Sequence, residues 1–273
     1  MAFAQLESLP HPGRGAYDEP LVDVAAYLQR IRYSGTLEPT LSTLRALYAS
    51  HLMTVPFEDL DLYVGRPVDL SPDALFDKIV RRNRGGFCYE LNGSFANLLR
   101  QMGFHVTLLN AQVSRKEGGF GPQFDHLALL VELESPWLVD VGYPRSPPEP
   151  LLLDTESAQG SGESSFRISR DEGSLCLFQE TPDGWSPEYR FDLQPRHIND
   201  FAGMCRFHET AAESPFYGWL GCTMLTPDGR ITLSDDKLIV RSKGTRTETP
   251  VPRRDVGALL REQFGIALEH EWL

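Results

Sequence analysis

The amino-acid sequence predicts an α+β fold built from three successive parts. Apolar residues recur at helical spacing through the first hundred or so residues, whereas residues 105–193 contain short apolar or alternating runs separated by Gly, Pro and Ser. Helices followed by strands, rather than a regular alternation, are typical of α+β proteins. We therefore expect a helical domain over residues 1–104, an antiparallel β-barrel domain over 105–196 and a C-terminal α/β region over 197–273.

The helical part begins with an irregular arm over residues 1–20, which contains three prolines. Four helices are expected after it. Ser71 and Pro72 supply a capping side chain and a proline suited to the first helical position, and the fourth helix follows a Gly-Gly turn. The expected helices begin near Leu21, Thr40, Ser71 and Cys88.

Short runs rich in Val and Leu predict the sheet of the middle part. The expected strands are His105–Val113, Asp125–Leu133, Trp137–Tyr143, Ser165–Ser169, Leu175–Gln179 and Tyr189–Leu193. Residues 159–164 are of low complexity and indicate a surface loop. In the last part we expect a helix over Ile198–Phe207, strands over Gly221–Leu225 and Ile231–Val240, and a helix over Asp255–Phe264.

The composition excludes several classes of function. The chain has 273 residues, of which 41% are hydrophobic, and its formal net charge of −12 argues against a nucleic-acid-binding surface. Four widely spaced cysteines without a CxxC pair argue against a structural zinc site and for a reducing compartment. The first twenty residues carry no long apolar run, so we expect neither a secretory signal nor a membrane anchor, and a cytoplasmic protein.

Cys88 is the first candidate for chemistry. It lies where the Gly85-Gly86 turn becomes an apolar-periodic helix, and the free N–H groups and dipole of a helix start favour an anion. A thiol at such a position is expected to ionise easily, and the thiolate is the nucleophile. The alternative is that Cys88 is a small buried apolar residue, the usual state of an intracellular cysteine.

A cysteine nucleophile needs a base, and His126 is the strongest candidate. It lies inside the expected strand Asp125–Leu133, where a histidine beside an apolar run needs a polar partner. The other six histidines are expected to be structural or to lie near the ends of the chain: His11, His51, His105, His197, His208 and His270.

Two aspartates compete to orient the ring of His126. Asp125 is its neighbour in the same strand and therefore points to the opposite face. Asp140 lies between valines in the next strand, and a buried aspartate needs a partner. A two-residue turn would place Leu129 opposite Asp140, so a longer or bulged turn is required for His126 and Asp140 to meet.

With these residues in this order, the sequence resembles the arylamine N-acetyltransferase family. The resemblance rests on motifs in a fixed order from about Val22 to the end of the chain. The three main motifs are Arg84–Asn92 around the cysteine, His126–Val131 and Trp137–Tyr143. Weaker matches are Pro39–Leu41, Val55–Asp61, Leu193–Arg196, Asp200-Phe201 and Thr226–Gly229.

The resemblance implies a helical domain with the cysteine, a β-barrel domain with the histidine and aspartate, and a C-terminal α/β lid. It also implies a Cys-His-Asp core like that of cysteine proteases. Cys88 would be the acyl-accepting nucleophile, His126 its base and Asp140 the orienting anion. Acetyl-CoA would acetylate Cys88, and an arylamine, arylhydrazine or arylhydroxylamine would then take the acetyl group in a ping-pong reaction. Acetyl-CoA is a substrate in this scheme, and no permanent cofactor or metal is expected.

Two aromatic side chains, Tyr143 and Phe216, match the family's pattern for the amine pocket, since flat rings stack on a flat substrate. Both also have an ordinary reading as core residues. The chain departs from the pattern at Pro144, which replaces a glycine, and in the shortened, proline-rich loop 145–150. Arg84 can serve either as a source of positive potential or as a structural ion-pair partner. No glycine motif for phosphate indicates where CoA binds.

Other functions use the same three residues. An amide synthase would release or cyclise a polyketide chain. A hydrolase of the papain or transglutaminase type uses a similar Cys-His-Asp catalytic triad. A catalytically silent binding module is a further alternative, which the intact Cys88, His126 and Asp140 argue against.

Overall fold

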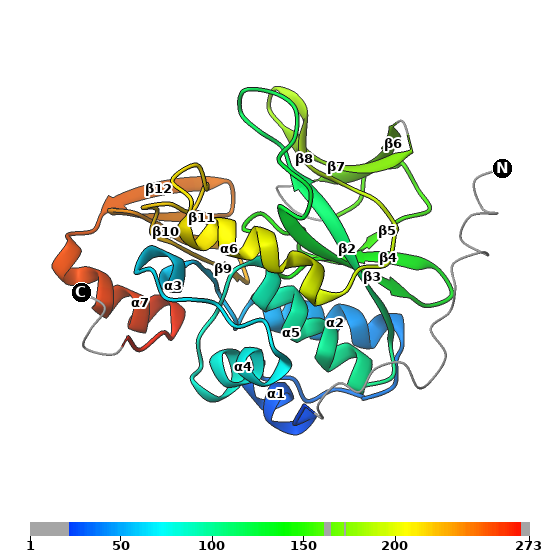
Figure 1. Ribbon diagram of the computed structural model, residues 1–273, viewed down its shortest axis with the longest axis horizontal. Helices are drawn as coiled ribbons and strands as arrows, with labels where there is room; N and C mark the ends of the chain where they lie inside the picture. The colour runs from blue at the N-terminus through cyan, green and yellow to red at the C-terminus, as the bar shows by residue number, and fades with distance from the viewer. Residues whose placement is uncertain (1–21, 161–164, 172, 269–273) are drawn as a thin grey trace.

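The computed structural model describes residues 22–160, 165–171 and 173–268 (Figure 1). The predicted N-terminal arm lies outside the described residues, as does most of the loop predicted over 159–164. The fold is α+β, as predicted: helices come first, an antiparallel sheet follows, and a second sheet with two helices completes the chain. Within the described residues, no helix is long and apolar enough to span a membrane.

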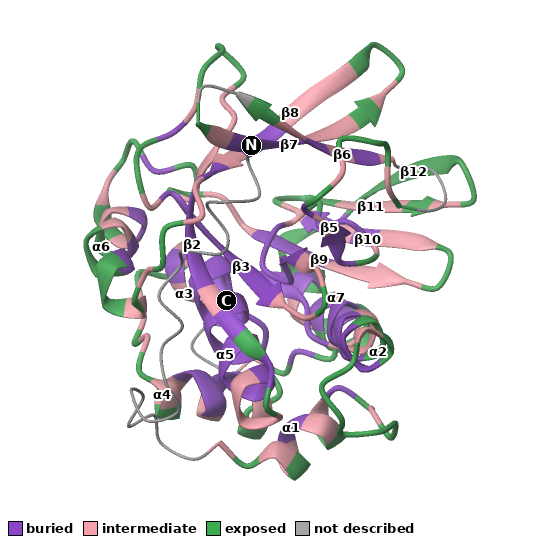
Figure 2. Ribbon diagram, turned by 90° about the vertical axis from the view of Figure 1, so that its right-hand side faces the viewer, coloured by how far each residue is buried: buried purple, intermediate pink, exposed green. Residues whose placement is uncertain are grey.

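The first part of the chain forms helices around one buried helix, α5. Thr40 caps α2 by accepting a hydrogen bond from the backbone N–H of Thr43, at 3.3 Å. All residues of α5 from Cys88 to Leu99 are buried, because other helices cover one side and a sheet covers the other (Figures 1 and 2). The elements are α1 (Val24–Arg30), α2 (Leu41–Leu52), α3 (Leu60–Tyr63), α4 (Pro72–Phe76), the π-helical turn η2 (Asp77–Arg81) and α5 (Cys88–Gln101).

The middle part is a seven-stranded antiparallel sheet in the order β5-β4-β3-β2-β8-β7-β6. The sheet curls so that one face of β3 packs on α5, through residues such as Leu127 and Leu129. The other face, with Ala128 and Leu130, encloses a separate apolar core. The strands are β2 (His105–Val113), β3 (His126–Glu132), β4 (Pro136–Val139), β5 (Leu151–Leu152), β6 (Phe166–Asp171), β7 (Ser174–Thr181) and β8 (Gly184–Phe191).

The last part carries a five-stranded sheet, and its first strand comes from the N-terminal part of the chain. The order is β1-β9-β10-β11-β12, and α7 packs on one face of the sheet. The remaining elements are β1 (Phe57–Glu58), η3 (Ile198–Phe201), α6 (Ala202–Thr210), β9 (Gly221–Thr226), β10 (Gly229–Ser234), β11 (Lys237–Ser242), β12 (Thr245–Pro250), η4 (Arg253–Asp255) and α7 (Val256–Phe264).

The structure corrects two of the expected strands. The single strand expected over Ile231–Val240 is a hairpin, in which Ser234 pairs with Lys237 and Asp235 adopts a left-handed φ of 52°. The strand expected over Trp137–Tyr143 ends at Val139, so Asp140 lies just past its end.

Candidate active site

Cys88 is the first residue of α5, at the end of the predicted turn, and only 3% of it is exposed. The Glu90 carboxylate accepts a hydrogen bond from the backbone N–H of Phe87 at 3.1 Å and closes the first turn. Burial raises the pKa of the Cys88 thiol well above its ordinary value, although a hydrogen bond from the backbone of Leu127 favours the thiolate. The expectation of an easily ionised thiol is therefore wrong for the thiol alone, because desolvation dominates. Ionisation here needs a proton acceptor.

His126 and Asp140 are directly hydrogen-bonded. His126 Nε2 lies 2.7 Å from Asp140 Oδ2, and each residue is 2% exposed. The turn between β3 and β4 has three residues rather than two, because Glu132 pairs with Pro136. Extending that register places Asp140 opposite Ala128, and His126 lies two residues from Ala128 on the same face. The two side chains are thus diagonal neighbours, which is within reach across a sheet.

Asn92 joins this pair to the helix that carries the cysteine. Its side-chain amide donates to Asp140 Oδ1 at 2.8 Å and to the carbonyl oxygen of Leu127 at 2.6 Å. Its own oxygen accepts from the backbone N–H of Val141 at 3.0 Å. Asn92 follows Cys88 by four residues, so both lie on one face of α5. The sequence signal for this residue is an amide inside an apolar-periodic helix, and that pattern alone predicts no role for it.

The chain after Asp140 passes directly over the first turn of α5. A Cβ atom on Gly142 would lie 2.8 Å from Cys88 Cα and 2.7 Å from Asn92 Nδ2, closer than real Cβ contacts, so only glycine fits there. The backbone N–H of Gly142 also donates to Asp140 Oδ1 at 3.0 Å. These contacts bring Cys88, His126 and Asp140 to one place, while their catalytic roles stay predictions.

Tyr143 lies against the imidazole. Its ring centroid is 5.3 Å from that of His126, and the ring of Tyr189 packs on His126 at 5.0 Å. The Tyr143 hydroxyl donates to Glu188 Oε2 at 2.6 Å, and Arg145 Nη2 donates to the same hydroxyl at 2.8 Å. The side chain is therefore held rigidly beside the predicted base.

Phe216 lies on the cysteine side of the site. Its ring is 5.9 Å from that of Phe87, the residue before Cys88, and 5.0 Å from that of His208. Among the described residues, no ring contact joins Phe216 to Tyr143.

Asp125 and Arg84 have structural partners. Asp125 is 5% exposed and pairs with Arg115 at 3.1 Å, and its Oδ1 lies 3.8 Å from Nε2 of the buried His208. Arg84 donates from Nε to Glu58 Oε1 at 2.9 Å, which favours its structural reading. In the described part of the chain, no group of three or more His, Cys, Asp or Glu residues could hold a metal ion.

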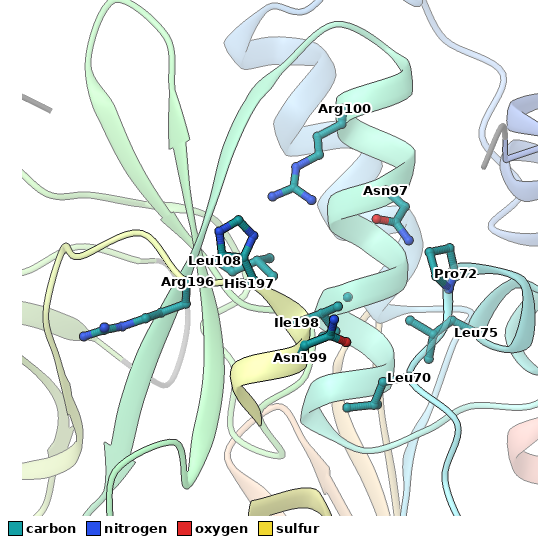
Figure 3. A pocket seen from close by; sticks show the side chains of 11 residues that line it. Leu70, Pro72, Leu75, Asn97, Arg100, Leu108, Arg196, His197, Ile198 and Asn199 are labelled. Carbon is teal, nitrogen blue, oxygen red and sulfur yellow. The ribbon is translucent and has the colours of Figure 1, made fainter. Parts of the chain in front are cut away.

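A cavity beside α5 does not include the three predicted catalytic residues (Figure 3). It encloses about 130 Å³, and its polar lining comes from Asn97 and Arg100 on α5 and from Arg196, His197 and Asn199 around the start of η3. Cys88, in contrast, is closed off from solvent in this structure. A substrate must therefore reach a thiol that is almost fully buried.

Comparisons with known proteins agree with the fold and the motifs. A family model described as N-acetyltransferase matches residues 40–273. The arylamine N-acetyltransferase of Mycobacterium bovis is 35% identical over 253 residues, covering 90% of this chain and 89% of that protein. Two solved arylamine N-acetyltransferases superpose closely on the structure.

The enzyme from M. tuberculosis has a TM-score of 0.85 and 34% identity, covering 89% of this chain and 94% of its own. The enzyme from Mycobacterium marinum, solved in complex with CoA, has a TM-score of 0.84 and 33% identity, covering 89% and 93%. Because sequence and structure agree over nearly the whole described chain, the protein belongs to the arylamine N-acetyltransferase family and is an N-acyltransferase.

Proposed function

We propose that this protein transfers an acetyl group from acetyl-CoA to an aromatic amine, hydrazine or hydroxylamine through a thioester on Cys88. The observation that carries the proposal is the cluster around the first turn of α5. There His126 is hydrogen-bonded to Asp140, and the backbone of the next residue, Leu127, is hydrogen-bonded to the buried thiol of Cys88. Membership of the family supports the reaction class, and the relative with bound CoA supports the donor.

In the first half-reaction His126 acts as the base. Asp140 holds Nε2 of the ring, so Nδ1 is the nitrogen left to accept the Cys88 proton, and the carboxylate stabilises the resulting imidazolium. Because burial raises the pKa of the thiol, the proton leaves as the sulfur attacks the acetyl carbonyl. The carbon–sulfur bond to CoA then breaks, and His126 returns the proton to the CoA sulfur. Backbone N–H groups near Cys88 would stabilise the oxyanion.

In the second half-reaction a neutral aromatic amine attacks the thioester carbonyl. An aromatic amine carries no ammonium proton at pH 7, so its lone pair is free to attack, and His126 takes the proton that the new amide loses. Tyr143 beside His126 and Phe216 near Cys88 offer aromatic faces for the acceptor ring. The carbon–sulfur bond to Cys88 then breaks, the product amide leaves, and His126 returns the proton to the Cys88 sulfur.

The four cysteines, all unpaired and buried, suit a reducing compartment. We therefore further propose a cytoplasmic enzyme that modifies foreign aromatic amines.

The experiment that tests the proposal is intact mass spectrometry after incubation with acetyl-CoA alone. We expect the wild-type protein to gain one acetyl group, which peptide mapping assigns to Cys88, and the addition of aniline to remove it. The Cys88→Ala variant should gain none while the other three cysteines remain. Acetylation of another residue, or none at all in the wild type, would contradict the proposal.

A further inference from the structure

His208 is a buried histidine that the proposed reaction does not use. It lies on α6, is 2% exposed and has aromatic rings on several sides. The centroid of its ring is 6.5 Å from that of Phe87, 6.0 Å from that of Tyr89 and 5.0 Å from that of Phe216. A polar ring among aromatic side chains costs free energy unless its nitrogens have partners. The groups that face those two nitrogens therefore indicate what the histidine does.

Each nitrogen of His208 faces a polar side chain. Nε2 lies 3.8 Å from Oδ1 of Asp125, the residue before His126, and Nδ1 lies 3.2 Å from Oγ of Ser214. Burial lowers the pKa of His208, so its ring is neutral at pH 7 and carries one proton. The carboxylate of Asp125 favours that proton on Nε2, which leaves Nδ1 to accept a hydrogen bond from the Ser214 hydroxyl.

Ser214 anchors the segment that carries Phe216. Of residues 211–220, which join α6 to β9, only Ser214 is buried, whereas Phe216 is half-buried. The Ser214 hydroxyl oxygen also accepts a hydrogen bond from the backbone N–H of Phe216, at 3.2 Å. Hydrogen bonds thus run from Phe216 to Ser214 and from Ser214 to His208, and the ring of Phe216 packs edge-on against the same histidine.

We propose that His208 is a positioning residue for the aromatic acceptor, because it holds Phe216 where the ring of the amine must pack. This inference rests on the proposed function, in which Phe216 offers an aromatic face near Cys88. The attraction between two aromatic rings changes with their distance and angle, so the face must be held in place. Without the bond between His208 and Ser214, packing alone would hold Phe216. An acceptor would then bind less tightly, while the earlier acetylation of Cys88 would be unaffected.

His208→Phe tests the proposal, since it removes the nitrogen that meets Ser214 and keeps a ring in its place. We expect the KM for aniline to rise about fivefold, because one hydrogen bond that holds Phe216 is lost. Acetylation of Cys88 by acetyl-CoA, followed in a single turnover by mass spectrometry, should keep its rate to within about twofold. Inorganic hydrazine has no aromatic ring, so it should remove the acetyl group equally fast from wild type and variant.

His208→Asn is the conservative variant that should restore the acceptor site. Its amide can meet Ser214 in the place of Nδ1, but it leaves space where the ring was. The KM for aniline should therefore stay close to that of the wild type, although this variant should unfold at a lower temperature than His208→Phe. A histidine with a merely structural role would give the opposite order, in which the less stable variant is the poorer enzyme.

The matched control is His51→Phe, which removes the nitrogens of another buried histidine. Nε2 of His51 contacts the hydroxyl of Tyr27 rather than the segment of Phe216, so the KM for aniline should not change. A double variant gives a second check. In the Phe216→Leu background, His208→Phe should add no further rise in KM, because the group through which His208 acts is gone.

Four results would each overturn the inference. They are an unchanged KM for aniline in His208→Phe, an equal rise in His208→Asn or His51→Phe, an additive rise in the double variant, and a loss of rate with hydrazine as large as that with aniline. If acetyl-CoA never acetylates Cys88 in the wild type, the proposed function fails instead.

Discussion

The side-chain carboxylate of Asp140 accepts three hydrogen bonds, which fix how it can hold the imidazole of His126. The amide of Asn92 and the backbone N–H of Gly142 both donate to Oδ1, at 2.8 Å and 3.0 Å. Oδ2 is therefore the oxygen that faces His126 Nε2. An amide in place of the carboxylate must turn its oxygen toward the two fixed donors, which places its NH₂ group against His126.

The Asp140→Asn variant should accordingly lose activity without losing its fold. An amide that donates to Nε2 moves the ring proton to Nδ1, which can then no longer accept a proton from Cys88. We expect kcat/KM for acetyl transfer to fall about 10⁴-fold, the size of the same change in a serine-protease triad. Initial rates and thermal unfolding measure the two effects, and the exposed Asp154→Asn serves as control. A loss below about tenfold would show that another group orients the imidazole.

At the scale of elements, the sequence predicts the helices and strands that have a periodic apolar pattern. It does not predict the elements that form only through tertiary contacts. The starts of α2, α4 and α5, and most strands of the curled sheet, were confirmed. The capping side chain expected at Ser71 was wrong, since its hydroxyl makes no capping hydrogen bond, whereas Thr40 does cap α2. The hairpin at Asp235 was read as one strand because its turn contains neither Gly nor Pro. β1, β5 and α3 were not predicted, since two to four residues are too few to show a period. β12 is exposed throughout, so it has no apolar alternation to detect.

The candidate site likewise contains residues that a local sequence pattern predicts and residues that it does not. Cys88 is marked by its Gly-Gly turn, and His126 and Asp140 by their place in apolar strands. Asn92 and Gly142 act only through contacts made by the folded chain, which no local pattern encodes. The raised pKa of the Cys88 thiol was missed for a similar reason, because burial depends on the whole surrounding structure.

Gly142→Ala tests how closely the segment after β4 must approach α5. The new methyl group would meet Cys88 Cα at 2.8 Å, so segment and helix must move apart. A displacement near 1 Å at reacting groups costs about 100-fold in rate, and we expect a loss of that order in acetylation of Cys88. The control is Gly203→Ala in α6, where a Cβ meets no heavy atom within 4 Å and activity should be unchanged. Equal activities of the two variants would refute the tight approach.

At the scale of the whole molecule, one core spans parts of the chain that we had expected to be separate domains. It contains Tyr27 of α1, Phe95 of α5, Val139 of β4 and Cys205 of α6. Buried polar groups inside it make its stability depend on pH. His51 is one of them: it is 0% exposed, contacts the Tyr27 hydroxyl at 3.1 Å, and its pKa is lowered to about 3 by burial.

The protein should therefore lose stability as the pH falls below about 6.5, the ordinary pKa of histidine. The unfolded chain binds a proton at His51 below that value, whereas the folded one stays neutral until about pH 3, so acid favours unfolding across that window. Between pH 6 and pH 5 the free energy of unfolding should fall by about 1 kcal/mol more in the wild type than in His51→Phe. Urea denaturation at each pH measures both slopes, and parallel slopes would contradict the assignment.

Helix α5 carries the proposed nucleophile, Cys88, at its first residue and, one turn later, the amide of Asn92 that donates a hydrogen bond to Asp140. When the helix slides or tilts as a rigid body, sulfur and carboxylate travel together, while the strand bearing the imidazole is tethered to both through Leu127. Opening of the protein to admit a substrate can therefore proceed around these groups without altering their mutual alignment. Turnover would then be governed by access to the thiol rather than by reassembly of the reacting groups.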